Sequence, residues 1–155
     1  MPPANLCEMD SMSEVGHDFP EDVVIHSDPA EARRVQEAIE ALLRAHDYGE
    51  HDIFGIRLAL EEALVNAIKH GNNMDRSKTV RIAYRVDRVR FDVFIADEGP
   101  GFDPTDVPDP TAVENLERPC GRGLMLMRYY MSEVSFGGRG NWVRMTKHLS
   151  NGSNQ

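Results

Sequence analysis

Three short segments, in a fixed order along 155 residues, constrain this chain more than any other feature. They are EEALVNAIKHGNN over residues 61–73, DEGPGFDP over 97–104 and GRGLMLM over 121–127. The first is typical of a helix, the second of a glycine turn after a strand, and the third of glycines at the entrance to another helix. Each alone is a weak signal. Together in one small chain they indicate a purine nucleotide held through a metal and backbone amides.

Length and charge limit the class of protein further. The chain has the length of one domain with a substantial core. Its 17 Lys and Arg against 26 Asp and Glu give a formal net charge of −9, which argues against direct binding to nucleic acid or to an anionic membrane. Its apolar runs are too short to span a bilayer, and the N-terminus lacks the basic and apolar regions of a signal peptide. We therefore expect a cytoplasmic location.

The two ends of the chain differ from its middle. Residues 1–18 are polar and without periodicity, which predicts a disordered N-terminal arm, and residues 150–155 are expected to be a frayed tail. Residues 19–149 carry the periodic segments and no internal linker. They are expected to form one domain, which carries all three motifs.

The pattern within residues 19–149 predicts an α+β fold. A strand over 23–26 is followed by helices from Pro29 to about His46 and from about Asp52 to His70. The later elements are strands over 80–86 and 91–97, a proline-rich loop or lid over 98–120, a helix over 122–132, and strands over 134–136 and 142–149. Helices grouped on one face of a mixed, mainly antiparallel sheet would make a two-layer α/β sandwich.

The first motif predicts a polar ridge on a helix. Glu62, Asn66 and His70 follow one another at intervals of four residues, so they share one helical face. The carbonyl oxygen of Asn66 is a hard ligand of the kind that Mg²⁺ prefers. A simple solvated face is the alternative reading of the same spacing.

The second and third motifs predict contacts to a base and to phosphates. Asp97 ends an apolar strand, where its carboxylate could accept a hydrogen bond from an exocyclic amine, and Gly99 and Gly101 permit close approach of the backbone. Gly121 and Gly123 precede an apolar helix whose free amides would suit a triphosphate. A plain turn and an unremarkable glycine pair are the alternatives for each motif alone.

Taken together, the motifs resemble the N, G1 and G2 boxes of the GHKL ATPases. The likeness is greatest to the serine kinases that act as anti-sigma factors in bacterial partner-switching modules. Their pattern E-A-x-x-N-A-x-x-H-G is matched by residues 62–71, and D-x-G-x-G by Asp97, Gly99 and Gly101. An L-E-R segment and G-x-G-[FL] are matched by 116–118 and 121–124. The resemblance covers about residues 20–149 and implies a Bergerat-type ATP-binding fold.

This resemblance implies a role for each matching residue. Glu62 would be the catalytic base, Asn66 would hold Mg²⁺ and Asp97 would read adenine, while Arg118 or Arg122 would lie near the phosphates. ATP and Mg²⁺ would be the cofactors. The full set implied to bind ATP is Asn66, His70, Gly71, Asp97, Gly99, Gly101, Phe102, Arg118, Gly121, Arg122, Gly123 and Leu124.

The resemblance also implies a function and partners. The chain would be an ATP-dependent serine-protein kinase that acts as an anti-sigma factor. It would phosphorylate a STAS-type anti-sigma-factor antagonist, sequester a sigma factor or similar partner, and form a homodimer. One alternative is an ATP-binding module that captures a partner without phosphorylating it. Another is the catalytic fragment of a histidine kinase, which is disfavoured because His46 lacks the downstream proline of a phosphoacceptor helix.

Overall fold

The computed structural model describes residues 19–100, 119–137 and 141–149, without the side chains of 119–122. The elements, in chain order, are β1 (Glu21–His26), α2 (Pro29–Ala45), α3 (Glu50–Val65), the π-helical turn η1 (Asn66–Gly71), β2 (Thr79–Val86), β3 (Arg90–Asp97), α4 (Pro119–Tyr130), β4 (Glu133–Gly137) and β5 (Trp142–His148).

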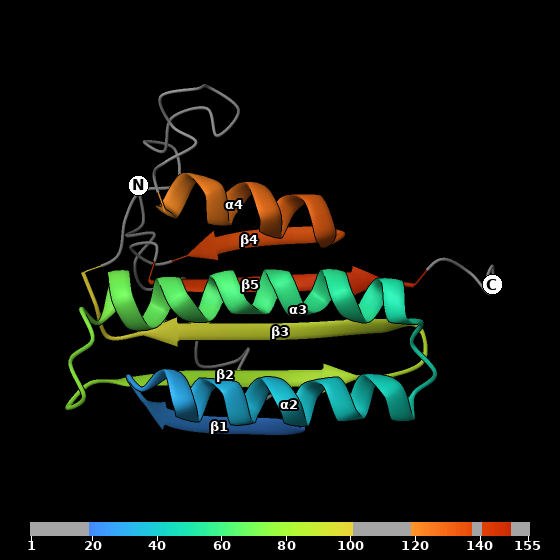
Figure 1. Cartoon of the computed structure of the whole chain (residues 1–155), viewed down its shortest axis with the longest axis horizontal. Helices are drawn as coiled ribbons and strands as arrows, with labels where there is room; N and C mark the ends of the chain where they lie inside the picture. Colours follow the sequence, from blue (N-terminus) through green and yellow to red (C-terminus); the bar gives the residue numbers. More distant parts are fainter. Residues whose placement is uncertain (1–18, 101–118, 138–140, 150–155) are drawn as a thin grey trace, which may run out of the picture.

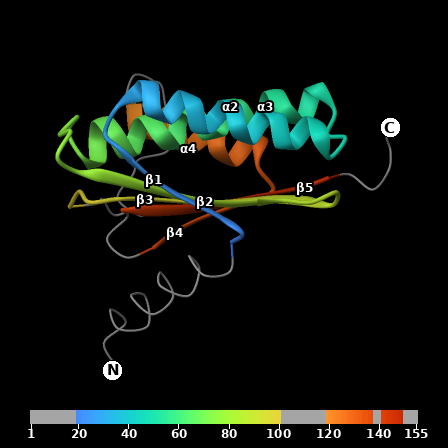
Figure 2. The same cartoon turned by 90° about the horizontal axis from the view of Figure 1, so that it is seen from below.

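The strands form one five-stranded sheet in the order β1-β2-β3-β5-β4, and α2, α3 and α4 cover one of its faces (Figures 1 and 2). This arrangement confirms the predicted two-layer α+β sandwich. A mixed sheet was expected, but all four pairings among the described strands are antiparallel. The central strand of the sheet is β3, which ends at Asp97.

Alternation along the strands decides which side chains reach the helices. Val80, Ile82 and Tyr84 of β2 belong to the main core with Phe91, Val93 and Ile95 of β3. Antiparallel register places Val80 opposite Asp97, so the start of β2 lies beside the end of β3. Apolar side chains on the sheet-facing sides of α2 and α3, among them Ile39, Ile56 and Leu60, complete the core.

Local signals explain where the helices begin and how they pack. Asp28 caps α2 by accepting a hydrogen bond from the Ala30 amide at 2.9 Å, and Pro29 occupies the first turn, where its missing N–H is not needed. Helices α3 and α4 lie against each other. A Cβ atom on Gly55 would lie 2.7 Å from the Tyr130 ring, so only glycine allows this contact.

The second predicted helix differs from expectation at its end. It is α-helical only to Val65, and residues 66–71 form a π-helical turn in which the Asn72 amide donates to the Ala67 carbonyl, five residues back, at 2.9 Å. Asn73 and Met74 then adopt positive φ angles of 53° and 59°, which reverse the chain toward β2. The third predicted helix starts at Pro119 rather than residue 122, so Gly121 and Gly123 lie inside α4 and do not precede it.

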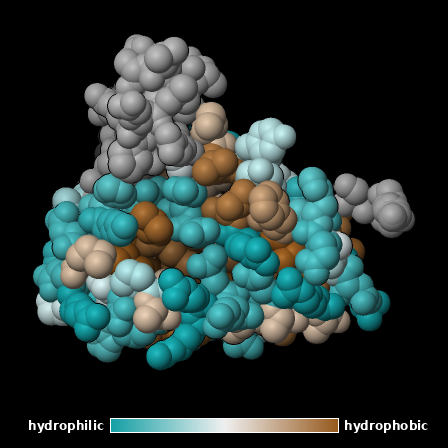
Figure 3. Space-filling view, in the orientation of Figure 1, coloured by the Kyte–Doolittle hydropathy of each residue, from teal (hydrophilic) through white to brown (hydrophobic). Residues whose placement is uncertain are grey.

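None of the described helices is both long and apolar enough to cross a membrane. In the helical face shown in Figure 3, hydrophilic residues cover most of the described surface, and hydrophobic residues gather toward α4.

Candidate nucleotide-binding site

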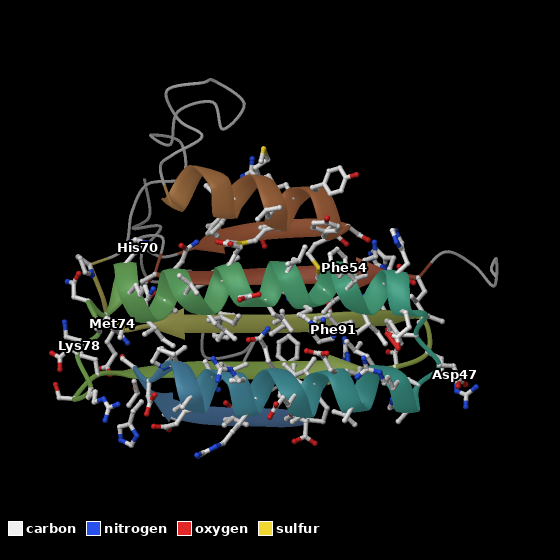
Figure 4. All side chains as sticks on the ribbon, in the orientation of Figure 1. Asp47, Phe54, His70, Met74, Lys78 and Phe91 are labelled. Atoms are coloured by element: carbon white, nitrogen blue, oxygen red, sulfur yellow. The ribbon has the colours of Figure 1, made fainter. Side chains whose placement is uncertain are left out.

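The described parts of the three motifs meet at one end of the molecule. Figure 4 shows His70, Met74 and Lys78 at this end, and Asp47 at the opposite end, beyond the start of α3. Here the turn η1 contacts both α4 and β3. The fold therefore brings together segments that are up to about 60 residues apart in the sequence.

Glu62 and Asn66 lie side by side against α4. A Cβ atom on Gly123 would lie 3.1 Å from both the Glu62 Oε2 and the Asn66 Nδ2 atoms. Both side chains are half-buried, so the predicted ridge exists as far as Asn66 and is not a freely solvated face. His70, the third predicted member, lies within the π-helical turn and is exposed.

The amide of Asn66 has a buried oxygen that accepts no hydrogen bond from any described residue. A buried acceptor without a donor is costly, and such groups in native proteins often await a ligand. A carbonyl oxygen is suited to Mg²⁺, which takes few protein ligands and the rest from water and phosphates. No group of three or more His, Cys, Asp or Glu side chains among the described residues could hold a metal by itself. The residues present therefore fit a metal shared between Asn66 and a phosphorylated ligand.

Asp97 is enclosed by two glycines. A Cβ atom on Gly71 would overlap the Asp97 carboxylate, and one on Gly99 would overlap the Gly71 carbonyl. Neither glycine adopts a positive φ angle, so both are required by close approach and not by backbone conformation. The Gly99 amide donates to Asp97 Oδ1 at 2.7 Å and orients the carboxylate.

Burial changes the acidity of this carboxyl group. Loss of solvation raises the pKa of Asp97 to about 6, although the hydrogen bond from the Gly99 amide and the charge of Lys78 both act to lower it. A carboxyl group with this pKa, at the end of a central strand, is a candidate for a functional group. When ionised it offers an acceptor to an amine, as the sequence predicts.

One residue of this site was missed by the sequence reading. Asn72 is fully buried, and its side chain bonds to Ser27, Thr79 and Glu98. From the sequence, Asn72, which follows His70 and Gly71, was predicted only to lie at the end of a helix. An Asn at the end of a buried helix is a weak signal, because caps and turns use the same residue.

The structure describes only some of the remaining predicted site residues. Gly101, Phe102 and Arg118 lie outside the described residues, as does most of the expected loop or lid over 98–120. Gly121 and Arg122 belong to the first turn of α4, where the side chains are not described. Leu124 is 5% exposed and packs inward.

Comparisons with known proteins identify the family of the chain. Residues 25–147 match the family described as the histidine kinase-like ATPase domain. The serine/threonine-protein kinase BtrW of Bordetella bronchiseptica is 32% identical over 95 residues, which cover 60% of this chain and 67% of BtrW. The serine-protein kinase RsbW of Bacillus subtilis is 33% identical over 110 residues, which cover 66% and 69% of the two chains.

A second group of relatives carries another name. The anti-sigma F factor of Bacillus thuringiensis is 30% identical over 119 residues, which cover 73% of this chain and 81% of that protein. A crystal structure of RsbU and RsbW domains from Mycobacterium tuberculosis shares the fold, with a TM-score of 0.51 at 19% identity, over 82% of this chain and 31% of that one. The chain therefore belongs to the histidine kinase-like ATPase domain family, the GHKL superfamily, and is similar within it to the bacterial anti-sigma-factor serine-protein kinases.

Proposed function

We propose that this chain is a serine-protein kinase that uses Mg-ATP and acts as an anti-sigma factor. The observation that carries the proposal is the pairing of Glu62 with Asn66 against Gly123, where the Asn66 oxygen is buried without a donor. This places a carboxylate beside a candidate metal ligand. The names of the similar proteins, serine-protein kinase and anti-sigma F factor, support the same function.

Asn66 and Asp97 would bind different parts of Mg-ATP. Asn66 would hold Mg²⁺ through its carbonyl oxygen, and the ion would supply positive charge that neutralises the phosphates of ATP. Asp97, in its ionised form, would accept a hydrogen bond from the 6-amino group of adenine. Gly71 and Gly99 keep the carboxylate of Asp97 in place by steric contact and through the Gly99 amide.

Glu62 would act as the general base. It would take the proton from an incoming serine hydroxyl while the serine Oγ bonds to the γ-phosphorus of ATP. The bond from that phosphorus to the β–γ bridging oxygen breaks, and ADP leaves. Phosphoryl transfer depends mainly on positioning and charge stabilisation, so one carboxylate beside a metal ligand is a sufficient protein contribution.

The proposed partners are those that the resemblance to the anti-sigma-factor kinases implies. The phosphorylated substrate would be a STAS-type anti-sigma-factor antagonist, and the sequestered partner would be a sigma factor. The active form would be a homodimer. An acidic chain with a net charge of −9 is suited to partners with basic surfaces.

The test is incubation of the chain with γ-labelled ATP and candidate STAS-type proteins from the same genome, followed by mapping of the phosphorylated residue. The proposal expects phosphoserine on one of these proteins. Label on a histidine of the chain itself would favour the histidine-kinase alternative. ATP binding without transfer to any of them would favour a partner-capture module.

A further inference from the structure

Asn72 joins the ends of three strands through one buried side chain. Its Nδ2 atom donates to the Ser27 Oγ atom and to the Thr79 carbonyl, both at 2.9 Å. Its Oδ1 atom accepts from the Glu98 amide at 2.8 Å. Ser27 follows β1, Thr79 begins β2 and Glu98 follows β3.

The contact with Glu98 lies next to the residue expected to read the base. Glu98 directly follows Asp97, whose carboxylate is enclosed by Gly71 and Gly99. Gly71 in turn directly precedes Asn72. Gly71, just before Asn72, therefore packs against the Asp97 carboxylate. The side chain of Asn72 holds the amide of Glu98, just after Asp97.

We propose that Asn72 is a positioning residue for nucleotide specificity, holding Asp97 where its carboxylate discriminates purines that carry a 6-amino group. This inference rests on the proposed ATP-binding function and extends it to a residue that does not touch the nucleotide. The amide is suited to the task because it satisfies two acceptors, the Ser27 Oγ atom and the Thr79 carbonyl, and one donor, the Glu98 amide, at fixed angles. No aliphatic side chain of similar size can do so.

A purely structural role would make a different prediction. If Asn72 only stabilised the fold, its loss would lower the melting temperature and weaken the binding of all nucleotides alike. A positioning role instead changes the ratio of two affinities. The suitable pair of probes is Mg-ATP and the Mg complex of purine riboside triphosphate, which lacks only the 6-amino group.

The experiment is calorimetric titration of both nucleotides into the full chain, in wild type, Asn72→Ala and Ser27→Ala. Wild type is expected to prefer ATP by about 10- to 100-fold, the usual effect of one hydrogen bond to a charged group. Asn72→Ala should reduce this preference to about threefold or less, while affinity for purine riboside triphosphate changes by less than about threefold. Ser27→Ala removes a bond of the same network away from Asp97, so it should lower the melting temperature but retain the preference.

A second pair of variants tests the positioning role of Asn72 if Asn72→Ala does not fold. Glu98→Pro removes the amide that donates to Asn72, and Glu98→Ala keeps this amide while removing the side chain that accepts from Thr79. The preference for ATP should fall in Glu98→Pro and persist in Glu98→Ala.

The possible failures are distinguishable. Wild type that binds neither nucleotide overturns the proposed function and the inference with it. Wild type that prefers ATP, with the same preference in Asn72→Ala, overturns the inference alone. If Asn72→Ala does not fold, an equal preference for ATP in Glu98→Pro and Glu98→Ala overturns the inference alone.

Discussion

At the scale of single residues, the acidity of Asp97 should make nucleotide binding depend on pH if this carboxylate reads the base as proposed. Burial raises the pKa of this carboxyl group to about 6. The folded protein therefore holds the proton more tightly than the unfolded chain does. Ionised Asp97 lowers the free energy of unfolding at pH values above about 6, and this cost disappears as pH falls toward the ordinary carboxyl value.

The same titration should appear in the preference for adenine. Below the pKa of Asp97 the carboxyl group must lose a proton before it can accept from the 6-amino group, so the ratio of affinities for ATP and purine riboside triphosphate should fall. The expected fall approaches tenfold for each pH unit below about 6. Titrations at several pH values measure it, and taking the ratio cancels the titration of the shared phosphates. A ratio independent of pH between about 5 and 7.5 would show that Asp97 does not read the base.

Glu62 should matter for transfer and not for binding. Glu62→Gln replaces the proposed base by an isosteric amide beside an unchanged Asn66, so affinity for ATP should stay within about threefold while serine phosphorylation falls by about 10²- to 10⁴-fold. Glu61 is exposed on the neighbouring face of α3 and provides the matched control, Glu61→Gln, which should keep nearly the full rate. Phosphorylation assays with a validated STAS substrate measure both. Full activity in Glu62→Gln would show that the base is another group.

At the scale of elements, the contact between α3 and α4 depends on Gly123. A Cβ atom there would lie 3.1 Å from side-chain atoms of Glu62 and of Asn66, so both must shift to admit it. Alanine also favours a helix over glycine by about 1 kcal/mol. Gly123→Ala should therefore weaken Mg-ATP binding by about tenfold or more without a large loss of thermal stability.

Its control is Gly49→Ala, before α3, where a Cβ atom would meet nothing within 4 Å. This variant should bind Mg-ATP as wild type does. Calorimetry and a melting curve on the same samples separate the two effects. Unchanged binding in Gly123→Ala would mean that the α3–α4 contact lies outside the nucleotide site.

The elements also show what could be read from the sequence and what could not. The spacing of Glu62 and Asn66 and the apolar strand before Asp97 are local patterns, and they predicted the helix and strand that carry these residues. The π-helical turn was not predicted from residues 66–71, whose last residue, Gly71, packs closely against Asp97, 26 residues further along the chain. Asn72 was missed for the same reason. Its partners Ser27 and Glu98 are 45 and 26 residues away, and nothing local to Asn72 indicates them.

At the scale of the whole molecule, the homodimer is expected from the likeness to anti-sigma kinases alone. Light scattering coupled to size exclusion should give a mass near twice the 17.5 kDa of one chain at micromolar concentration. A mass equal to that of one chain at all accessible concentrations would contradict the homodimer. It would leave the nucleotide site unaffected.

Calorimetric titration of ATP into the chain, with and without Mg²⁺, tests most directly whether the site around Asn66 and Asp97 binds Mg-ATP. Wild type should bind with a dissociation constant in the micromolar range, about −8 kcal/mol, and lose most of this affinity when the ion is chelated. Asn66→Ala should lose the dependence on Mg²⁺. Asn73→Gly, which removes an exposed amide of the same motif at a position with φ of 53°, should bind as wild type does. Absence of heat and of thermal stabilisation by Mg-ATP in wild type would show that this site does not bind the nucleotide.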